Sequence, residues 1–130
     1  MKPDELAERF LDFEVRVCNV DALPDTRAGR HVANQLIRSG TAPGPNYEEG
    51  CAAESRRDFC HKLGIVLKEL RESRHWLRLI VQAKLITVKK MSGLVDESDQ
   101  LCRIIGKSIA TAKGEGRDKN QERDKDQAET

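Results

Sequence analysis

Seven positions between residues 59 and 80 repeat with spacings that alternate between four and three residues. They are Phe59, Leu63, Val66, Leu70, Ser73, Leu77 and Ile80. Six of the seven are apolar and the seventh is a small serine, so one side of a helix here is apolar along its whole length. A helix with such a seam packs nearly parallel to its neighbours. The spacing therefore predicts a helix over about residues 55–84, with Ser55 as its N-cap, in a helical bundle.

Three further segments show helical patterns. Residues 4–20 carry a second seam of the same spacing, made of Leu6, Phe10, Phe13, Val17 and Val20. Residues 26–39 and 93–113 each have apolar residues on one side, with Asp25 or Thr26 and then Ser92 as candidate N-caps. The links between these segments are short, so sequential helices are expected to be neighbours. The sequence therefore predicts an all-α, up-down-up-down four-helix bundle.

Two prolines interrupt the second helical segment. The stretch Ala42-Pro43-Gly44-Pro45 follows Thr41, and proline removes a backbone donor and collides with the preceding helical turn. We expect helix 2 to be kinked or broken near Pro43 and Pro45 and to resume over about residues 45–53. An uninterrupted helix would need local distortion.

The chain of 130 residues is expected to form one domain followed by a tail. Gly114-Glu115-Gly116 is predicted to end the last helix, and the residues beyond it are almost all polar or charged. We therefore predict a bundle domain over residues 1–113 and a disordered charged tail over residues 114–130. No apolar run approaches the roughly 20 residues that span a bilayer. The four cysteines match no zinc signature and are typical of buried thiols in a reducing compartment, so we expect a cytoplasmic protein.

Apolar residues of the third helix extend beyond its seam. Ile65, Trp76 and Leu79 lie to one side of the seam, where a monomeric bundle needs only one apolar stripe. An apolar flank that includes a tryptophan is typical of a subunit interface, so these three residues are the candidate oligomer interface. The alternative is a wide core face that absorbs all three.

Basic residues line another side of the same helix. Arg71, Arg74, His75 and Arg78 are spaced so that they form one stripe, and Lys68 extends it. Arginines on one rigid face can grip phosphates through bidentate contacts, which makes nucleic acid a candidate partner. No aromatic residues accompany the stripe, so contacts to the phosphate backbone are expected rather than base stacking. The alternative is a solvated face balanced by Glu69 and Glu72.

The sequence offers no catalytic or metal-binding constellation. Glu72 and His75 form the Glu-x-x-His unit of di-iron bundles, but a second copy on another helix and matching inward glutamates are missing. Cys60 and His61 are adjacent, so their side chains diverge on a helix and cannot form a catalytic pair. Gly40 and Gly44 lack the Lys and Ser/Thr of a phosphate loop. We therefore expect no enzyme activity, no metal and no cofactor.

Three blocks of the chain resemble one family. They are Gln35-Leu36-Ile37-Arg38-Ser39-Gly40-Thr41, Asn46-Tyr47-Glu48-Glu49-Gly50 with Asp58-Phe59, and Lys68-Glu69-Leu70-Arg71-Glu72-Ser73-Arg74-His75-Trp76-Leu77. In this order, over about residues 5–112, they resemble the four-helix-bundle proteins encoded in intervening sequences of bacterial large-subunit ribosomal RNA genes, often labelled a ribosomal protein family. The chain departs from the family at Ala42-Pro43-Gly44-Pro45. In relatives the sequence of this stretch looks compatible with a continuous helix.

The resemblance implies a left-handed four-helix bundle that assembles as a ring, with five copies as the expected number, and no known enzyme activity. The resemblance extends to accessory proteins of diversity-generating retroelements, which look like binders of nucleic acid and reverse transcriptase through basic surfaces. By this resemblance, RNA, DNA or a nucleic-acid-handling protein is the expected partner. Arg38, Arg71, Arg74 and Arg78 match the basic positions of the family. The alternative is a purely structural or protein-interaction scaffold. Asn46 could bond a helix end through its side chain, and Glu48 or Glu49 could pair with Arg38 or an arginine of the third helix.

Overall fold

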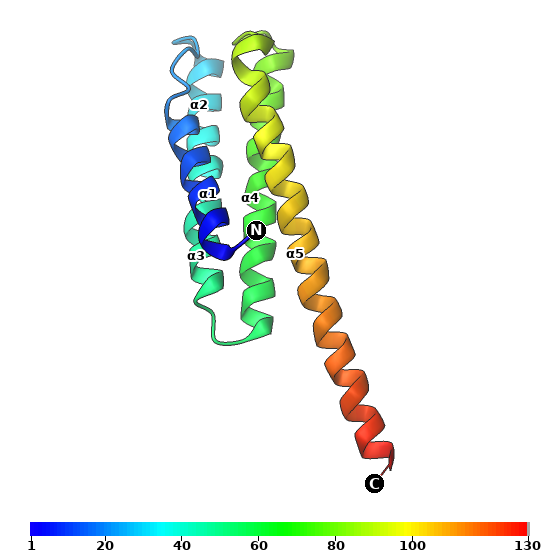
Figure 1. Cartoon of the computed structure of the whole chain (residues 1–130). Coiled ribbons are helices and arrows are strands. Elements are labelled where there is room, and N and C mark those ends of the chain that lie inside the picture. Colours follow the sequence, from blue (N-terminus) through cyan, green and yellow to red (C-terminus); the bar gives the residue numbers. More distant parts are fainter. Residues whose placement is uncertain (130) are drawn as a thin grey trace.

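The structure is a computed structural model that describes the backbone of residues 1–129 and the side chains of residues 1–114. Its helices are α1 (Pro3–Cys18), α2 (Arg27–Thr41), α3 (Pro43–Cys51), α4 (Arg56–Gln82) and α5 (Val88–Glu129). Figure 1 shows that α3 continues the line of α2, so the two act as one bent helix beside α1, α4 and α5. The all-α four-helix bundle and the bend in its second helix are confirmed.

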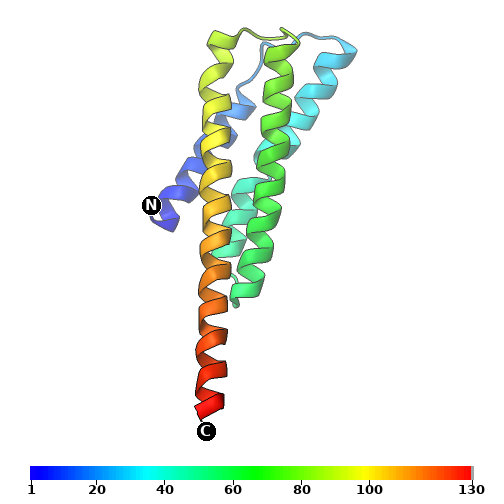
Figure 2. The same cartoon turned by 90° about the vertical axis from the view of Figure 1, so that its right-hand side faces the viewer.

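The four rods form a square in which α1 and α4 stand on a diagonal. Both pack against α2, α3 and α5, and no Cα atom of α1 lies within 8 Å of one in α4. Figure 2 shows the same arrangement from the side, with α4 and α5 in front of α1 and α2. The outer sides of α1 and α4 therefore point in opposite directions.

The seams of the sequence form the core. The α4 positions from Leu63 to Ile80 are all buried, while Phe59 is half-buried and packs against them. The first four seam residues of α1 are buried as well, and Val20 is partly buried. Ser73 is fully buried and its hydroxyl donates to the Glu69 carbonyl at 2.9 Å, so the one polar seam residue is satisfied within its own helix.

The bend between α2 and α3 has local causes. Pro43 and Pro45 cannot donate to the preceding turn, yet Ala42 between the two helices keeps helical angles of φ −81° and ψ −36°. The Thr41 hydroxyl bonds the Ile37 carbonyl at 2.6 Å, and the Asn46 side-chain amide bonds the Ala42 carbonyl at 2.9 Å. Side-chain bonds to backbone carbonyls of this kind bend helices without ending them.

The helices α2 and α4 begin at the predicted N-caps, whereas α5 begins earlier than predicted. The Thr26 and Ser55 hydroxyls accept from the third backbone N–H beyond them, at 3.0 and 3.1 Å, so both are N-caps as expected. A Cβ on Gly29 would lie 2.0 Å from the Pro24 carbonyl oxygen, so this turn requires glycine. By contrast, α5 begins at Val88 and not after Ser92, because the Thr87 carbonyl already accepts from Met91 at 3.2 Å.

The far end of α5 differs from the sequence expectation. The helix continues through Gly114 and Gly116 to Glu129, and Figure 1 shows it extending beyond the ends of the other helices. Gly114 lacks the positive φ that stops a helix, so the glycines do not end α5. The division into a bundle of residues 1–113 and a disordered tail of residues 114–130 stays a prediction, and the side chains beyond residue 114 lie outside the described ones.

Candidate nucleic-acid interface

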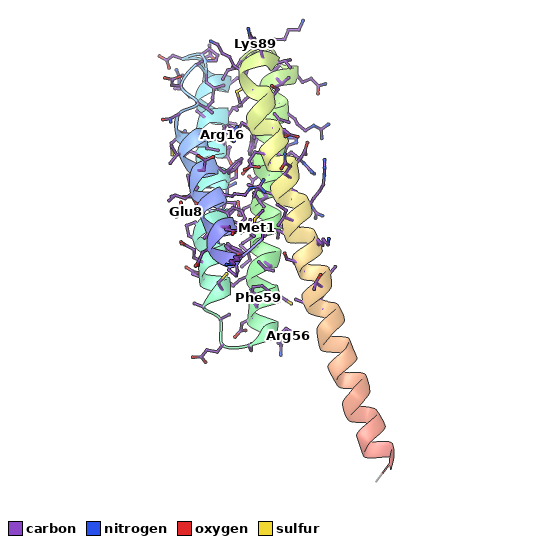
Figure 3. The ribbon with its side chains drawn as sticks, in the orientation of Figure 1. Met1, Glu8, Arg16, Arg56, Phe59 and Lys89 are labelled. Carbon is purple, nitrogen blue, oxygen red and sulfur yellow. The ribbon has the colours of Figure 1, made fainter. Side chains whose placement is uncertain are left out.

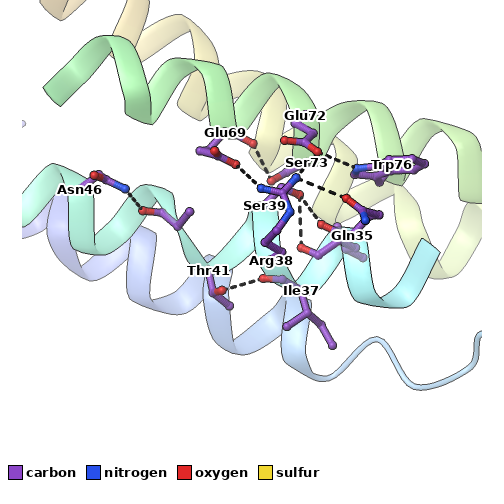
Figure 4. A network of polar contacts seen from close by, with 12 residues as sticks. Gln35, Ile37, Arg38, Ser39, Thr41, Asn46, Glu69, Glu72, Ser73 and Trp76 are labelled. Carbon is purple, nitrogen blue, oxygen red and sulfur yellow. Dashed lines mark hydrogen bonds and ion pairs between the residues drawn. The ribbon is translucent and has the colours of Figure 1, made fainter. Parts of the chain in front are cut away.

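Two of the predicted phosphate-binding arginines lie against carboxylates. Arg74 turns toward α5, where its guanidinium lies 3.4 Å from Asp99. Arg38 on α2 reaches across to α4 and pairs with Glu69 at 3.4 Å and with Glu72 at a closer distance, as Figure 4 shows. The hydrogen bond from Arg38 is the main cause that lowers the pKa of Glu72. These two arginines are thus engaged within the bundle.

The other predicted basic residues belong to a longer row on α4. The row begins at Arg57, about three turns before Lys68, where the predicted stripe began, and Gly64 is its only position without a basic side chain. Its members are Arg57, His61, Lys68, Arg71, His75 and Arg78, called the basic stripe below. All six are exposed, and no described carboxylate forms an ion pair with any of them.

The basic stripe has the same spacing as the core seam but faces the opposite way. With Gly64 included, its members repeat as four and three residues, which keeps them on one side of the helix. The period was visible in the sequence, and extending it toward the helix start would have included Arg57 and His61. A Cβ on Gly64 would meet nothing within 4 Å, so the helix backbone is open to a ligand there.

Two arginines outside the basic stripe form ion pairs with carboxylates that flank it. Glu69 and Glu72 flank the stripe on the α2 side and are bound by Arg38, while Asp99 flanks it on the α5 side and is bound by Arg74. These three carboxylates are therefore partly neutralised by residues outside the stripe, whereas Asp58, beside Arg57, forms no described ion pair. The stripe remains an elongated cationic surface along most of its length.

The predicted oligomer-interface residues are all half-buried within one chain. Trp76 donates to Glu72 at 3.4 Å, and its ring lies edge-on to those of His31 and His75, with centroids 5.8 and 5.3 Å away. Leu79 packs against the core and also lines a hollow of about 430 Å³ on α4. Ile65 is half-buried without joining the core cluster.

The sequence analysis missed a second apolar surface. Leu11, Val15 and Ile37 are 54%, 51% and 45% exposed, and the first two belong to a helix whose other large apolar residues are buried. Leu11 and Val15 are one turn apart on α1, on the side away from its seam. Their signal in the sequence was weak because isolated apolar residues between charged ones are common on protein surfaces.

The block from Asn46 to Gly50 has structural roles. Tyr47 is buried against Phe10, with ring centroids 5.2 Å apart, and burial raises the pKa of its phenol. Glu49 pairs with Lys62 of α4 at 2.7 Å, so neither Arg38 nor an arginine of α4 is its partner. A Cβ on Gly50 would lie 3.1 Å from Lys62, near the first turn of α4 where Figure 3 shows Arg56 and Phe59. The block therefore fixes α3 against α1 and α4.

Neither a metal centre nor a membrane span emerges from the described residues. No group of three His, Cys, Asp or Glu side chains among residues 1–114 is placed to hold a metal ion. Glu72 of the Glu-x-x-His unit is bound by Arg38, and His75 is exposed on the basic stripe. None of the described helices has the length and apolar character needed to cross a bilayer.

The fold defines the protein as an all-α four-helix bundle, and comparisons with known proteins then identify its family. A crystal structure from Bacteroides thetaiotaomicron, of a protein with unknown function from the S23 ribosomal protein family, is similar to this chain. Its TM-score is 0.76 and its identity is 32%, over 85% of this chain and 99% of that one. No curated protein matches the chain. Residues 5–107 match the model of the 23S rRNA-intervening sequence protein family, and the chain belongs to that family.

Proposed function

We propose that this chain is a non-enzymatic, homo-oligomeric protein that binds RNA or DNA through the basic stripe of α4. The observation that carries the proposal is a row of six exposed basic side chains on one helix face, none of which forms an ion pair with a carboxylate among residues 1–114. From Arg57 to Arg78 the row spans about 32 Å at ~1.5 Å per residue. A straight cationic row of this length fits a run of backbone phosphates.

The chemistry of the stripe favours phosphate over bases. Arginine forks bind phosphate oxygens in pairs, and the exposed backbone at Gly64 allows a close approach. The stripe contains no Phe, Tyr or Trp, so it has no stacking platform for bases. Binding should therefore be weakly dependent on sequence and strongly dependent on salt, because each neutralised phosphate releases counterions.

Self-association is supported by the exposed apolar residues. Leu11, Val15 and Ile37 remain open to water in one chain, and a neighbouring copy would cover them. Five copies is the number expected from the family resemblance. Repetition of the stripe around a ring would multiply the affinity of a single weak site. The expectation of buried thiols is wrong for Cys18 and Cys51, which are exposed, and only Cys102 is fully buried. All four cysteines are free, which suits the reducing cytoplasm that we propose as the compartment.

The second candidate function is a structural or protein-interaction scaffold that ignores nucleic acid. The exposed apolar residues on α1 and α2 favour it, because they suit a protein partner and not a phosphate backbone. The two functions differ in salt dependence, so one titration series separates them.

The test replaces three residues of the stripe with glutamate: Arg57, Lys68 and Arg71. We expect the binding of the full chain to a labelled duplex or single strand to fall at least tenfold at 50 mM salt. The slope of log affinity against log salt should fall by about 3, since each lost phosphate contact removes about one. Fluorescence anisotropy measures both. The matched control reverses Arg27 of α2 and Lys89 and Lys90 of α5, which are exposed and lie on other helices than the stripe. Equal binding by the two triple variants would contradict the proposal.

A further inference from the structure

The outer side of α1 is acidic as well as apolar. Glu8 and Asp12 lie within one turn of Leu11 and Val15, and both carboxylates are exposed without a described ion pair. Figure 3 shows Glu8 on the outer side of α1. We call Glu8, Leu11, Asp12, Val15 and Ile37 the acidic face.

Ile37 joins this face from α2. A Cβ on Gly40 would lie 2.9 Å from Val17, which fixes the height at which α2 crosses α1. Gly44, one turn after Gly40, lies against Glu14 and Phe10, so the two helices run in opposite directions and Ile37 stands beside the end of α1, beyond Val17. Figure 4 shows the Ile37 side chain pointing away from the Arg38 network and from α4.

The acidic face is not suited to pairing with itself. A two-fold contact would place Glu8 and Asp12 of one copy against those of the other, and like charges brought together oppose association. The partner surface must instead be apolar at its centre and basic at its rim. Among residues 1–114, the α4 hollow combines both characters, because it is lined by the apolar Leu79 and Ala83, by the basic His75 and Arg78, and by Gln82.

We propose that the acidic face of one copy docks onto the α4 hollow of the next. Leu11 and Val15 would enter the hollow against Leu79, while Glu8 and Asp12 would meet Arg78 and His75. The two surfaces lie on diagonal helices and point in opposite directions, so the contact is head-to-tail. Head-to-tail contacts produce rings when the rotation closes and filaments when it does not.

This docking rests on the proposed self-association and not on nucleic-acid binding. It also divides α4 into two zones. The hollow, with His75 and Arg78, contacts the next copy, and the earlier part of the stripe from Arg57 to Arg71 stays open to phosphates. Substitutions in the two zones should therefore affect different measurements.

The test uses two charge-reversed versions of the full chain. One carries Glu8→Lys and Asp12→Lys, and the other carries His75→Glu and Arg78→Glu. Each alone should sediment as a monomer of 14.7 kDa at concentrations where the parent is an oligomer. An equal mixture of the two should associate, because each reversed surface then meets its complement. The two variants must alternate, so a ring with an odd number of copies would keep one mismatched contact, and the mixture should form open or even-numbered assemblies. A chain that carries all four changes should also assemble.

The mixture serves as its own folding control, since association requires both variants to be folded. Arg57→Glu is the matched control within α4 and should leave the oligomer intact. A monomeric parent would overturn both the docking and the proposed self-association. An oligomer that survives in either variant, or two monomeric variants that stay apart when mixed, would overturn the docking alone.

Discussion

Lys84 ends α4 in a conformation that costs energy. Its φ is 58°, in the left-handed region, which costs a residue with a side chain about 1–2 kcal/mol. Its N–H bonds the Val81 carbonyl at 3.1 Å, and the N–H of Leu85 bonds the Ile80 carbonyl at 2.9 Å. This is the Schellman motif, whose left-handed position is usually glycine.

We predict that Lys84→Gly stabilises the bundle by about 0.5–1 kcal/mol. Glycine removes the strain, although its greater freedom in the unfolded chain offsets part of the gain. Urea unfolding measures the difference. Ala83→Gly is the control, because Ala83 has a φ of −79° and gains nothing from glycine. A destabilised Lys84→Gly variant would show that the lysine side chain contributes more than its backbone strain costs.

The spacing of basic residues predicted which of them share one face of a helix. It did not predict which residues their side chains contact. Lys68, Arg71 and Arg78 followed from spacing alone, because a helix places such positions on one side. Arg38 and Arg74 did not, since their contacts with Glu72 and Asp99 depend on which helices are neighbours. Spacing within one helix carries no information on that arrangement.

At the scale of the element, the contact between α1 and α3 holds a carboxylate in an unfavourable place. The Glu14 side chain lies against Gly44, where a Cβ would come within 2.0 Å of its carboxylate oxygen. That buried oxygen has no described hydrogen-bond partner. Burial, followed by the charge of Glu48, raises the pKa of Glu14.

We predict that Glu14→Gln stabilises the protein at neutral pH. A raised folded-state pKa means that the stability from protonated Glu14 is present below its unfolded value of 4.5 and is lost as the pH rises through the folded value. The advantage of the glutamine variant should therefore grow as the pH rises through that window and vanish in acid. Urea unfolding between pH 4 and 8 tests this.

Glu54→Gln is the matched control for that series, because Glu54 is exposed in the turn before α4. A glutamine variant at position 14 whose advantage is the same at every pH would contradict the ionisation argument. The bend that places Gly44 here was predicted from Pro43 and Pro45, whereas the burial of Glu14 was not, because a charged residue beside a seam normally faces water.

At the scale of the whole molecule, the seams predicted four packed helices. They did not predict that α1 and α4 stand diagonally opposite each other in the bundle. Each seam shows which side of its helix is buried and is silent on which partner buries it. The opposite orientation of the acidic face on α1 and the basic stripe on α4 follows from that diagonal.

The segment beyond residue 114 differs from the rest of the chain in net charge and in its expected contribution to stability. It holds six acidic and four basic residues, so residues 1–114 carry a net charge of +3 against +1 for the whole chain. In Figure 1 this part of α5 extends beyond the other helices. We predict that deleting residues 115–130 leaves the melting temperature within about 2 °C, because a segment outside the packed bundle contributes little to global stability.

The same deletion should strengthen nucleic-acid binding at low salt, by about two- to threefold, because it removes net negative charge that repels phosphates at long range. The gain should disappear at 0.5 M salt, where charges are screened within a few ångströms. Calorimetry and anisotropy on the shortened chain measure the two effects separately. A large fall in melting temperature would place the end of α5 within the cooperative fold, and an affinity unchanged at low salt would mean that this segment does not act on the basic stripe.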